Sequence, residues 1–473
     1  MPAMLNDGVD GLDGARPPIV VIGSGPVGLA LATALRGHGL PVLLLESGGE
    51  GSEAKVQELS SAERIEPERH DDTMIAMARQ LGGTSNLWGA RCLPYDPIDF
   101  ETRPGIDAHW PIGAADLAPY WPAALRAAQS GAAVFEAGSP LLPKADADFS
   151  ADRLERWANI QAAQVIHRQA IASDPGLDLR THCTLVSLDI ETDGRIGAID
   201  VAHSLSGKRA RFSPGITVLA MGGLETTRAL LAAQRQAPRI FGGSEGPLGR
   251  HYMGHVIGEI ADIVLADGNL GRAFDFHVDE HGSYVRRRFQ PNEALQRQHG
   301  LMNSAFWPVV PPIADPRHGS ATLSMVYLAL SIPALGRLVT AEAIRRRHIP
   351  ERPGQFVRHL ANVLTGAPSA LAFALRFFRD RYFGNQRLPG FFIRNAANRY
   401  GLSYHGEHAP SPSSRVWLGD ARDRLGVPSL KIDLRFHDAD IDSLLRTHDL
   451  LESWLTRNGV GHLEYRVPRE ERG

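Results

Sequence analysis

The chain has 473 residues, enough for two or three domains, and its 43% hydrophobic and 22% charged residues exclude a disordered protein. A net charge of −3 gives no overall field that favours nucleic acid or a membrane surface. The two cysteines, Cys92 and Cys183, exclude a disulfide framework and a cysteine-rich zinc site, so we expect no metal and a cytoplasmic location.

The N-terminal third begins with a polar leader, residues 1–16, which lacks the apolar core of a secretory signal. Ile19–Ile22 is a continuous apolar run and predicts a strand buried on both faces. Val27–Leu35 predicts a helix rich in small residues, and Val42–Leu45 predicts a second buried strand. This order of elements predicts an α/β fold that opens with a doubly wound parallel sheet.

The rest of the chain continues this pattern and then changes. Ile216–Ala220 predicts a third buried strand, followed by a helix. From about residue 256 strands alternate with long helices, which predicts a second, α+β domain built on an antiparallel sheet. Arg415–Leu418 and Leu430–Phe436 alternate like paired strands. Asp438 can cap a helix that Asn458-Gly459 ends.

A glycine motif, Gly23-Ser24-Gly25-Pro26-Val27-Gly28, lies between the first strand and its helix. Gly23 permits a tight turn, Gly25 lets the backbone approach a pyrophosphate, and Gly28 lets helix and strand pack closely. The N–H groups at the start of the helix favour phosphate. Glu46, 18 residues after Gly28, can accept hydrogen bonds from ribose hydroxyls and would repel the 2′-phosphate of NADP. The alternative is a structural turn beside a surface carboxylate.

The first motif does not distinguish FAD from NAD, but two further segments favour FAD. Arg79–Gly89 is a glycine-rich loop with polar and aromatic members, and its backbone can lie against a planar ring and a pyrophosphate. Val218–Gly223 is a strand that ends in small residues, where the adenosine half of a dinucleotide could cross closely. Either segment alone could be a structural turn; together with the first motif they predict a dinucleotide site.

At these motifs the sequence resembles the glucose–methanol–choline oxidoreductases, in particular a bacterial branch with a Thr-Ser-Asn-Leu-Trp loop. The matches run in the same order from about residue 18 to 465, and they include the first glycine motif, Gly82–Gly89, Trp110-Pro111-Ile112, Ala220–Thr227, Gly249–Met253 with His255, and Ser414–Leu418. The resemblance implies an FAD-dependent enzyme that oxidises CH–OH groups of a sugar, polyol or other small alcohol by hydride transfer to flavin N5. It leaves the substrate and the electron acceptor open.

The resemblance also implies domains and site residues. It divides the chain into residues 17–110 and 161–255 for FAD, residues 111–160 as a connecting or lid segment, and residues 256–473 for substrate. At the position where some relatives attach flavin to a histidine this chain has Leu87, so we expect noncovalent FAD. The expected cofactor residues are Gly23, Ser24, Gly25, Pro26, Gly28, Glu46, Ser47, Gly82, Gly83, Thr84, Trp88, Gly89, Leu185 (through its backbone, on the adenine side), Ala220 and Gly222.

The catalytic histidine of the family lies in a late segment that has no counterpart before Gly473. We expect this histidine, and the last segment of the FAD domain, to lie beyond Gly473 in a longer enzyme. The alternatives are a degenerate or partner-completed flavin-fold protein without activity of its own and, less well supported, an NAD-dependent dehydrogenase. Of the histidines present (His251, His255, His405 and His408), His255 matches a family histidine between the two domains. A pocket-wall role fits it better than catalysis.

A basic stretch, Arg337–Arg399, contains twelve arginines and three acids and so carries a charge of +9. Its uncharged part, Ala361–Leu375, and the uncharged Gly319–Gly336 before it are predicted to be buried core and not membrane spans. One interpretation of the basic stretch is an amphipathic surface for anionic lipid or an acidic partner. The favoured one is solvated helices over the substrate domain, with arginine stems packed on apolar neighbours. Those neighbours are Phe356, Leu360, Leu371, Phe377 and Phe378.

Overall fold

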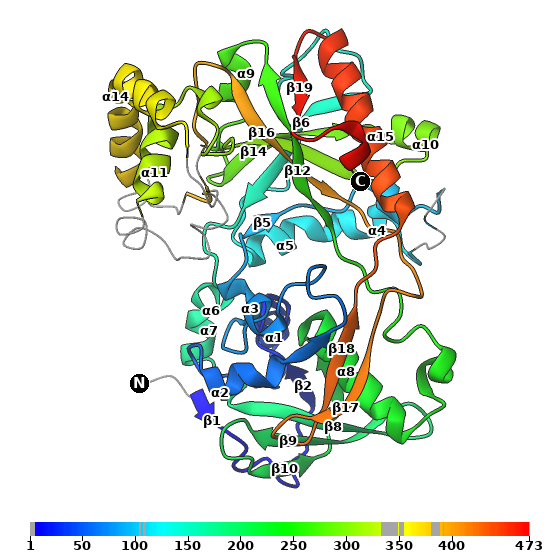
Figure 1. The fold of residues 1–473 in the computed structure, drawn as a ribbon. Helices are drawn as coiled ribbons and strands as arrows, with labels where there is room; N and C mark the ends of the chain where they lie inside the picture. The colour runs from blue at the N-terminus through cyan, green and yellow to red at the C-terminus, as the bar shows by residue number, and fades with distance from the viewer. Residues whose placement is uncertain are drawn as a thin grey trace.

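The computed structural model describes residues 5–103, 106, 110–332, 349, 354–379, 388–390 and 392–472. It has two lobes, one built on a parallel sheet and the other on a large antiparallel sheet (Figure 1). The chain crosses between the lobes several times, so each lobe contains segments that are far apart in sequence. The fold is therefore a mixed α/β fold with several sheets.

The parallel sheet of the lower lobe has the strand order β1-β7-β3-β2-β11. Every neighbouring pair in it is parallel. The strands are β1 (Leu5–Asp7), β2 (Ile19–Ile22), β3 (Val42–Leu45), β7 (Leu177–Thr181) and β11 (Ile216–Leu219). All residues of β2 and β3 are buried, as their continuous apolar sequences predict.

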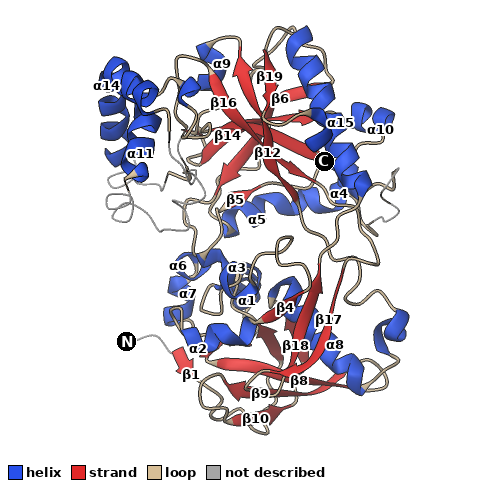
Figure 2. Cartoon of the chain, in the orientation of Figure 1, coloured by secondary structure: helices blue, strands red, loops and turns tan. Residues whose placement is uncertain are grey.

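Different layers cover the two faces of this sheet (Figure 2). On one face lies α1 (Pro26–Gly37), whose Leu29 and Ala32 are completely buried. The other face packs against α8 (Gly222–Gln236) and a three-stranded antiparallel sheet, β10-β9-β8. These strands are β8 (Cys183–Ile190), β9 (Ile196–His203) and β10 (Arg209–Phe212). The sheet is thus buried on both faces, and its strand ends are left to form a site.

The upper lobe is built on an eight-stranded antiparallel sheet with the order β19-β12-β16-β15-β14-β6-β5, to which β13 adds by pairing with β14. The long helix α15 (Asp438–Arg457) packs on it through Leu444, Leu451, Trp454 and Leu455. The strands are β5 (Arg91–Cys92), β6 (Phe149–Trp157), β12 (Val256–Leu265), β13 (His277–Val278), β14 (Tyr284–Pro291), β15 (Ser304–Val309), β16 (Arg399–Gly406) and β19 (Gly461–Tyr465).

Short helices complete the two lobes. They are α2 (Ala54–Gln57), α3 (Thr73–Ala76), α4 (Ala114–Leu117), α5 (Trp121–Ala127), α6 (Ala163–Ile166), α7 (Arg168–Ser173), α9 (Gly268–Ala273) and α10 (Glu293–His299).

The division of the chain differs from the expected one in two places. β6 lies within residues 111–160, the expected connecting segment, yet it pairs with β14 over most of its length. β17 (Arg415–Arg422) and β18 (Pro428–Asp433) lie within residues 256–473, yet β18 pairs in parallel with β4 (Ala62–Arg64) in the lower lobe. Both differences arise from pairing between distant segments, which local sequence patterns do not contain.

A pair of helices, α11 (Ala321–Ser331) and α14 (Phe356–Phe378), lies at one side of the upper lobe (Figure 1). The prediction that Ala361–Leu375 is buried core is wrong, because Leu364 and Leu371 in its middle are 72% and 63% exposed. α11 fits the prediction in part, with Leu323, Tyr327 and Leu330 buried. In the part of the chain that the structure describes, the helices lack the length and apolar character needed to cross a bilayer.

Candidate functional site

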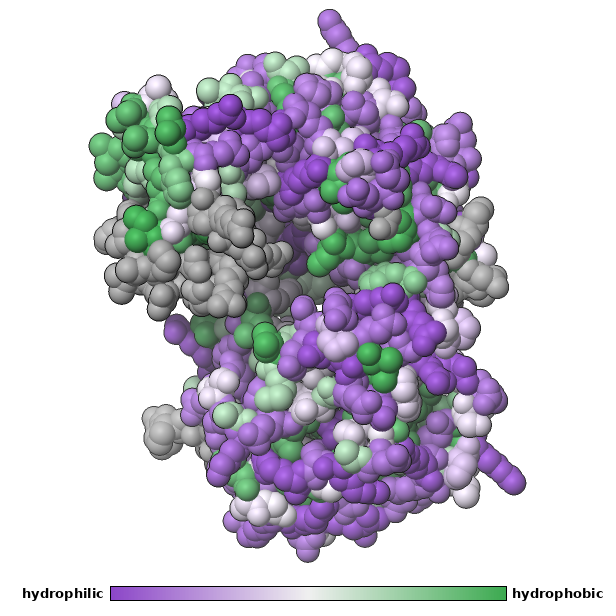
Figure 3. All heavy atoms as spheres, viewed as in Figure 1, coloured by the Kyte–Doolittle hydropathy of each residue, from purple (hydrophilic) through white to green (hydrophobic). Residues whose placement is uncertain are grey.

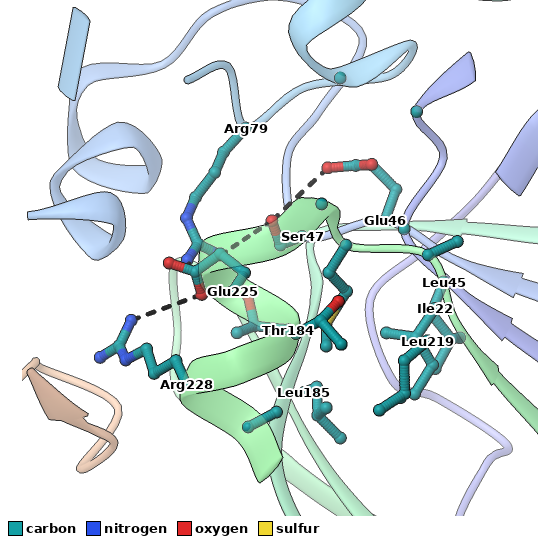
Figure 4. Close-up of a pocket in the computed structure, with 18 of the residues that line it drawn as sticks. Ile22, Leu45, Glu46, Ser47, Arg79, Thr184, Leu185, Leu219, Glu225 and Arg228 are labelled. Atoms are coloured by element: carbon teal, nitrogen blue, oxygen red, sulfur yellow. Dashed lines mark hydrogen bonds and ion pairs between the residues drawn. The ribbon is translucent and has the colours of Figure 1, made fainter. Parts of the chain in front are cut away.

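A cavity of about 640 Å³ opens at the carboxyl ends of β2, β3 and β11 (Figure 4). In α/β sheets this edge is where ligands bind, because the loops that follow parallel strands meet there. Ile22, Leu45 and Leu219, the last residues of the three strands, form its apolar floor. Of the expected cofactor residues, those that line it are Gly23, Ser24, Gly25, Pro26, Glu46, Ser47, Gly83, Thr84, Leu185, Ala220 and Gly222.

Two helices begin at this cavity. The N-terminal residues of α1, Gly25 and Pro26, and those of α8, Gly222 and Gly223, all line it. Neither helix has a side chain that caps its first N–H groups. Uncapped N–H groups and the positive end of the helix dipole together attract anions. The cavity therefore has two backbone sites suited to phosphate.

The three glycines of the first motif have different roles. Gly23 has φ +103°, and a Cβ there would lie 2.5 Å from the carbonyl oxygen of Ala220. A Cβ at Gly28 would overlap the carbonyl oxygen of Gly23, so Gly28 is needed for α1 to pack on β2. A Cβ at Gly25 would meet no atom within 4 Å. Only Gly25 thus faces open space within the cavity, where a bound group can approach the backbone.

Glu46 follows β3 directly and is 5% exposed, which excludes the alternative of a surface carboxylate. It accepts hydrogen bonds from the Ser24 N–H (3.1 Å), the Ser24 hydroxyl (2.5 Å) and the Gly48 N–H (2.8 Å). Burial raises the pKa of this carboxyl, while these hydrogen bonds and the charge of Arg79 oppose the rise. The Glu46 carboxylate thus holds the first glycine turn in place through Ser24. Its oxygens also lie at the cavity wall, where they can accept hydrogen bonds.

A series of paired charged side chains lines one side of the cavity (Figure 4). The sequence did not predict this series. Arg79 pairs with Glu225 at 2.6 Å and donates to the Ser47 hydroxyl at 3.2 Å. Glu225 lies 3.6 Å from Arg228, which pairs with Asp423 at 2.8 Å. Arg228 and Asp423 are separated by 195 residues, so no spacing in the sequence reveals the pair.

The remaining expected cofactor residues are not among the cavity's lining residues. Gly28 packs between α1 and β2. The Gly82 N–H donates to the Ser24 carbonyl at 3.1 Å, which ties the second glycine loop to the first. The Trp88 indole donates to the Gln161 carbonyl at 2.8 Å. Trp88 and Gly89 therefore belong to the part of the loop that leads away from the cavity towards the upper lobe.

That loop leads to a pair of histidines in the upper lobe. Arg91 follows Gly89 by two residues, a span of at most about 7 Å, and donates to Nδ1 of His405 at 2.8 Å. The His405 ring stacks against His255 with centroids 5.6 Å apart. Burial and the charge of Arg91 lower the pKa of His405 to about 3 and also lower that of His255. Both rings are therefore neutral at neutral pH.

The other two histidines have different surroundings. His408 is fully buried; its Nδ1 accepts from the Gly254 N–H at 3.1 Å, and its Nε2 donates to the Arg435 carbonyl at 2.7 Å. Because both ring nitrogens are engaged, His408 holds the crossing between the lobes. His251 and His255 are both exposed, and His251 has φ +56°. Of the two, His255 stacks on His405 beside Arg91, so it is the one that could face a substrate, as a wall or as a proton acceptor.

No known protein-family profile matches the chain. Two curated oxidases match parts of it. Paromamine 6'-oxidase of Streptomyces fradiae is 33% identical over 137 residues, which cover 24% of this chain and 24% of that protein. 6'''-Hydroxyparomomycin C oxidase of Streptomyces lividus is 30% identical over 115 residues, 22% of this chain and 21% of that protein. The matches span less than a quarter of each relative's length, and they support oxidoreductase chemistry.

Proposed function

We propose that the cavity binds FAD noncovalently and that the chain is an FAD-dependent oxidoreductase of the glucose–methanol–choline type. One observation carries the proposal: the uncapped N-termini of α1 and α8 meet at one cavity, with a buried carboxylate, Glu46, at its wall. Two anion sites and one ribose acceptor are what a dinucleotide requires. The volume of about 640 Å³ is within the range of cofactor pockets.

The choice of FAD over NAD rests on the second glycine loop. A Cβ at Gly83 would lie 3.0 Å from Cα of Gly25, so this loop lies directly against the first glycine turn. Gly83 and Thr84 therefore add a further backbone segment to the wall of the same cavity, and their loop continues along the chain to Arg91 in the upper lobe. A cofactor held by α1, α8 and this loop would extend from the cavity towards the upper lobe. This length suits a dinucleotide whose reactive ring lies between the lobes.

Different residues of the chain would bind different parts of the cofactor. The N–H groups of α1 and α8 hold the phosphates, Glu46 orients a ribose, and the backbone at Leu185 borders the adenine side. Leu87 offers no nucleophile, so the cofactor stays noncovalent. When bound, FAD supplies the hydride acceptor at flavin N5. Oxidation of an alcohol also needs an acceptor for the hydroxyl proton, and His255, which is exposed and stacks on His405, is the first candidate among His251, His255, His405 and His408.

The proposed substrate is a sugar, polyol or amino sugar oxidised at a CH–OH group. Support comes from the two relatives, which are named as oxidases of paromamine and of a hydroxyparomomycin. In the upper lobe Arg91 and Trp307 lie beside His405, with the Arg91 guanidinium 4.7 Å from the Trp307 ring centroid. An aromatic face and hydrogen-bond donors together are suited to a polar, ring-shaped substrate.

The test is anaerobic reduction of the purified, FAD-loaded protein by a panel of amino sugars, sugars and simple alcohols, followed by loss of flavin absorbance. If a histidine already present, with His255 the first to test, accepts the hydroxyl proton, at least one CH–OH compound should bleach the flavin and none of the matched deoxy compounds should. FAD that stays oxidised with the whole panel would contradict the proposed activity, and a protein that takes up no FAD would contradict the proposed cofactor.

A further inference from the structure

The outer face of α14 carries a stripe of large aliphatic side chains. Val357, Leu360, Leu364, Leu371 and Leu375 are 82%, 52%, 72%, 63% and 66% exposed. Their spacing of three, four, seven and four residues places them on one side of a helix. Single exposed apolar residues are common on soluble proteins, but a continuous stripe of this length marks a surface that binds something.

The inner face of the same helix is polar or small. His359 is fully buried, stacks on Tyr327 at a centroid distance of 4.0 Å and shares a hydrogen bond of 3.0 Å with the Ser324 hydroxyl. Asn362 donates to the same hydroxyl at 3.1 Å, and Gly366 packs on Ala321. A helix on a water-soluble core normally has the opposite arrangement, with its leucines inside. Helices that face lipid associate through small and polar residues instead.

The stripe is part of a wider apolar surface. Met325, Val326 and Ile332 of the neighbouring α11 segment are 42%, 40% and 51% exposed. In Figure 3 hydrophobic side chains gather over α11 and α14, whereas most of the remaining visible surface is hydrophilic. The surface is thus concentrated on this helix pair, which we name the α11–α14 face.

The positive charge of α14 indicates which kind of partner the α11–α14 face binds. α14 contains no acidic residue, and Arg358 is exposed near its start. A second copy of the chain would bring two basic α14 helices together, which electrostatics disfavours. An anionic bilayer offers both an apolar interior and negative headgroups.

We propose that the α11–α14 face binds the surface of an anionic phospholipid bilayer, with the leucine stripe in the acyl boundary and Arg358 at the headgroups. The pair lies in the interface and does not cross the bilayer. This membrane attachment is independent of the proposed oxidoreductase activity, because the cofactor cavity lies in the other lobe.

The experiment is co-sedimentation of the full chain with phosphatidylcholine vesicles, with and without phosphatidylglycerol. We expect strong binding only with phosphatidylglycerol. Leu364→Asp should weaken it about ten- to a hundredfold, because a leucine side chain no longer leaves water. Arg358→Gln should weaken it about fivefold on anionic vesicles. The matched control is Leu205→Asp, an exposed leucine of the lower lobe, which should bind like the wild type.

Three results would overturn the proposal. The first is wild-type protein that stays in the supernatant with both kinds of vesicle, and the second is a Leu364→Asp variant that binds as well as wild type. The third is a wild-type dimer in sedimentation equilibrium that Leu364→Asp converts to monomer, which would make the face a contact between copies. Since residue 364 is 72% exposed, the variant is expected to fold, and circular dichroism checks this.

Discussion

Substitution of Gly25 by valine separates cofactor binding from folding. Gly25 precedes the first turn of α1 with φ −66° and ψ −178°, an extended conformation that any residue can adopt. A Cβ there meets no atom within 4 Å. Gly25→Val should therefore leave the fold intact, and a less flexible unfolded chain can even add about 0.4–1 kcal/mol of stability.

The same substitution should weaken FAD binding strongly, because the new side chain occupies the cavity in front of the helix N-terminus. A hydrogen bond between a backbone N–H and a phosphate contributes about 1.5–3 kcal/mol. Loss of one such bond raises the Kd about ten- to 150-fold, and loss of two raises it by the square of that factor.

The assay is fluorescence titration of FAD into apoprotein, with thermal unfolding measured in parallel. Gly37→Ala is the matched control, since Gly37 ends the same helix and also faces open space. It should bind FAD like the wild type. Gly28→Ala, which overlaps the Gly23 carbonyl, should instead lose stability. Full FAD affinity in a folded Gly25→Val variant would refute the placement of the phosphates.

Three further predictions concern Arg228, His448 and His255. Arg228→Met should lower the free energy of unfolding by about 3–5 kcal/mol in urea titrations, because Asp423 loses its partner in a buried pair; an unchanged midpoint would contradict this role. His448 is fully buried and its pKa is lowered to about 4, so the unfolded chain binds the proton more readily and stability falls as the pH drops from about 6.5 to 4. His448→Phe should remove about 3 kcal/mol of this acid sensitivity, seen as a flatter dependence of stability on pH. His255→Gln should keep FAD content and slow flavin reduction about 10²–10⁴-fold if His255 takes the hydroxyl proton; a normal rate would leave it a wall of the pocket.

Local signals in the sequence were sufficient to predict the core strands of the lower lobe. Ile19–Ile22 and Val42–Leu45 form strands with the predicted bounds, because continuous apolar runs between tight turns have few other solutions. The C-terminal helix ends at Asn458 and Gly459 as predicted, with Gly459 at φ +64°. Its N-cap is His437, one residue before the expected cap Asp438, and Asp440 accepts from the His437 N–H.

Contacts between distant segments were not predictable in this way. The pairing of β18 with β4 and the pair Arg228–Asp423 join residues whose spacing carries no pattern. The orientation of α14 was missed for another reason. Its apolar stripe is visible in the sequence, but the periodicity does not show whether the stripe faces a hydrophobic core or the surface of the protein. Burial was the ordinary expectation, and the polar contacts of His359 and Asn362 reversed it.

The central claim is that the cavity at the ends of β2, β3 and β11 holds FAD. The most direct measurement is the absorption spectrum of the purified chain, together with chromatography of what acid precipitation releases. We expect flavin absorption bands, complete release because Leu87 forms no covalent bond, and a released compound that co-elutes with FAD. A protein that retains flavin in the precipitate would contradict noncovalent binding. A colourless protein that binds NAD but takes up no added FAD would contradict FAD binding in this cavity.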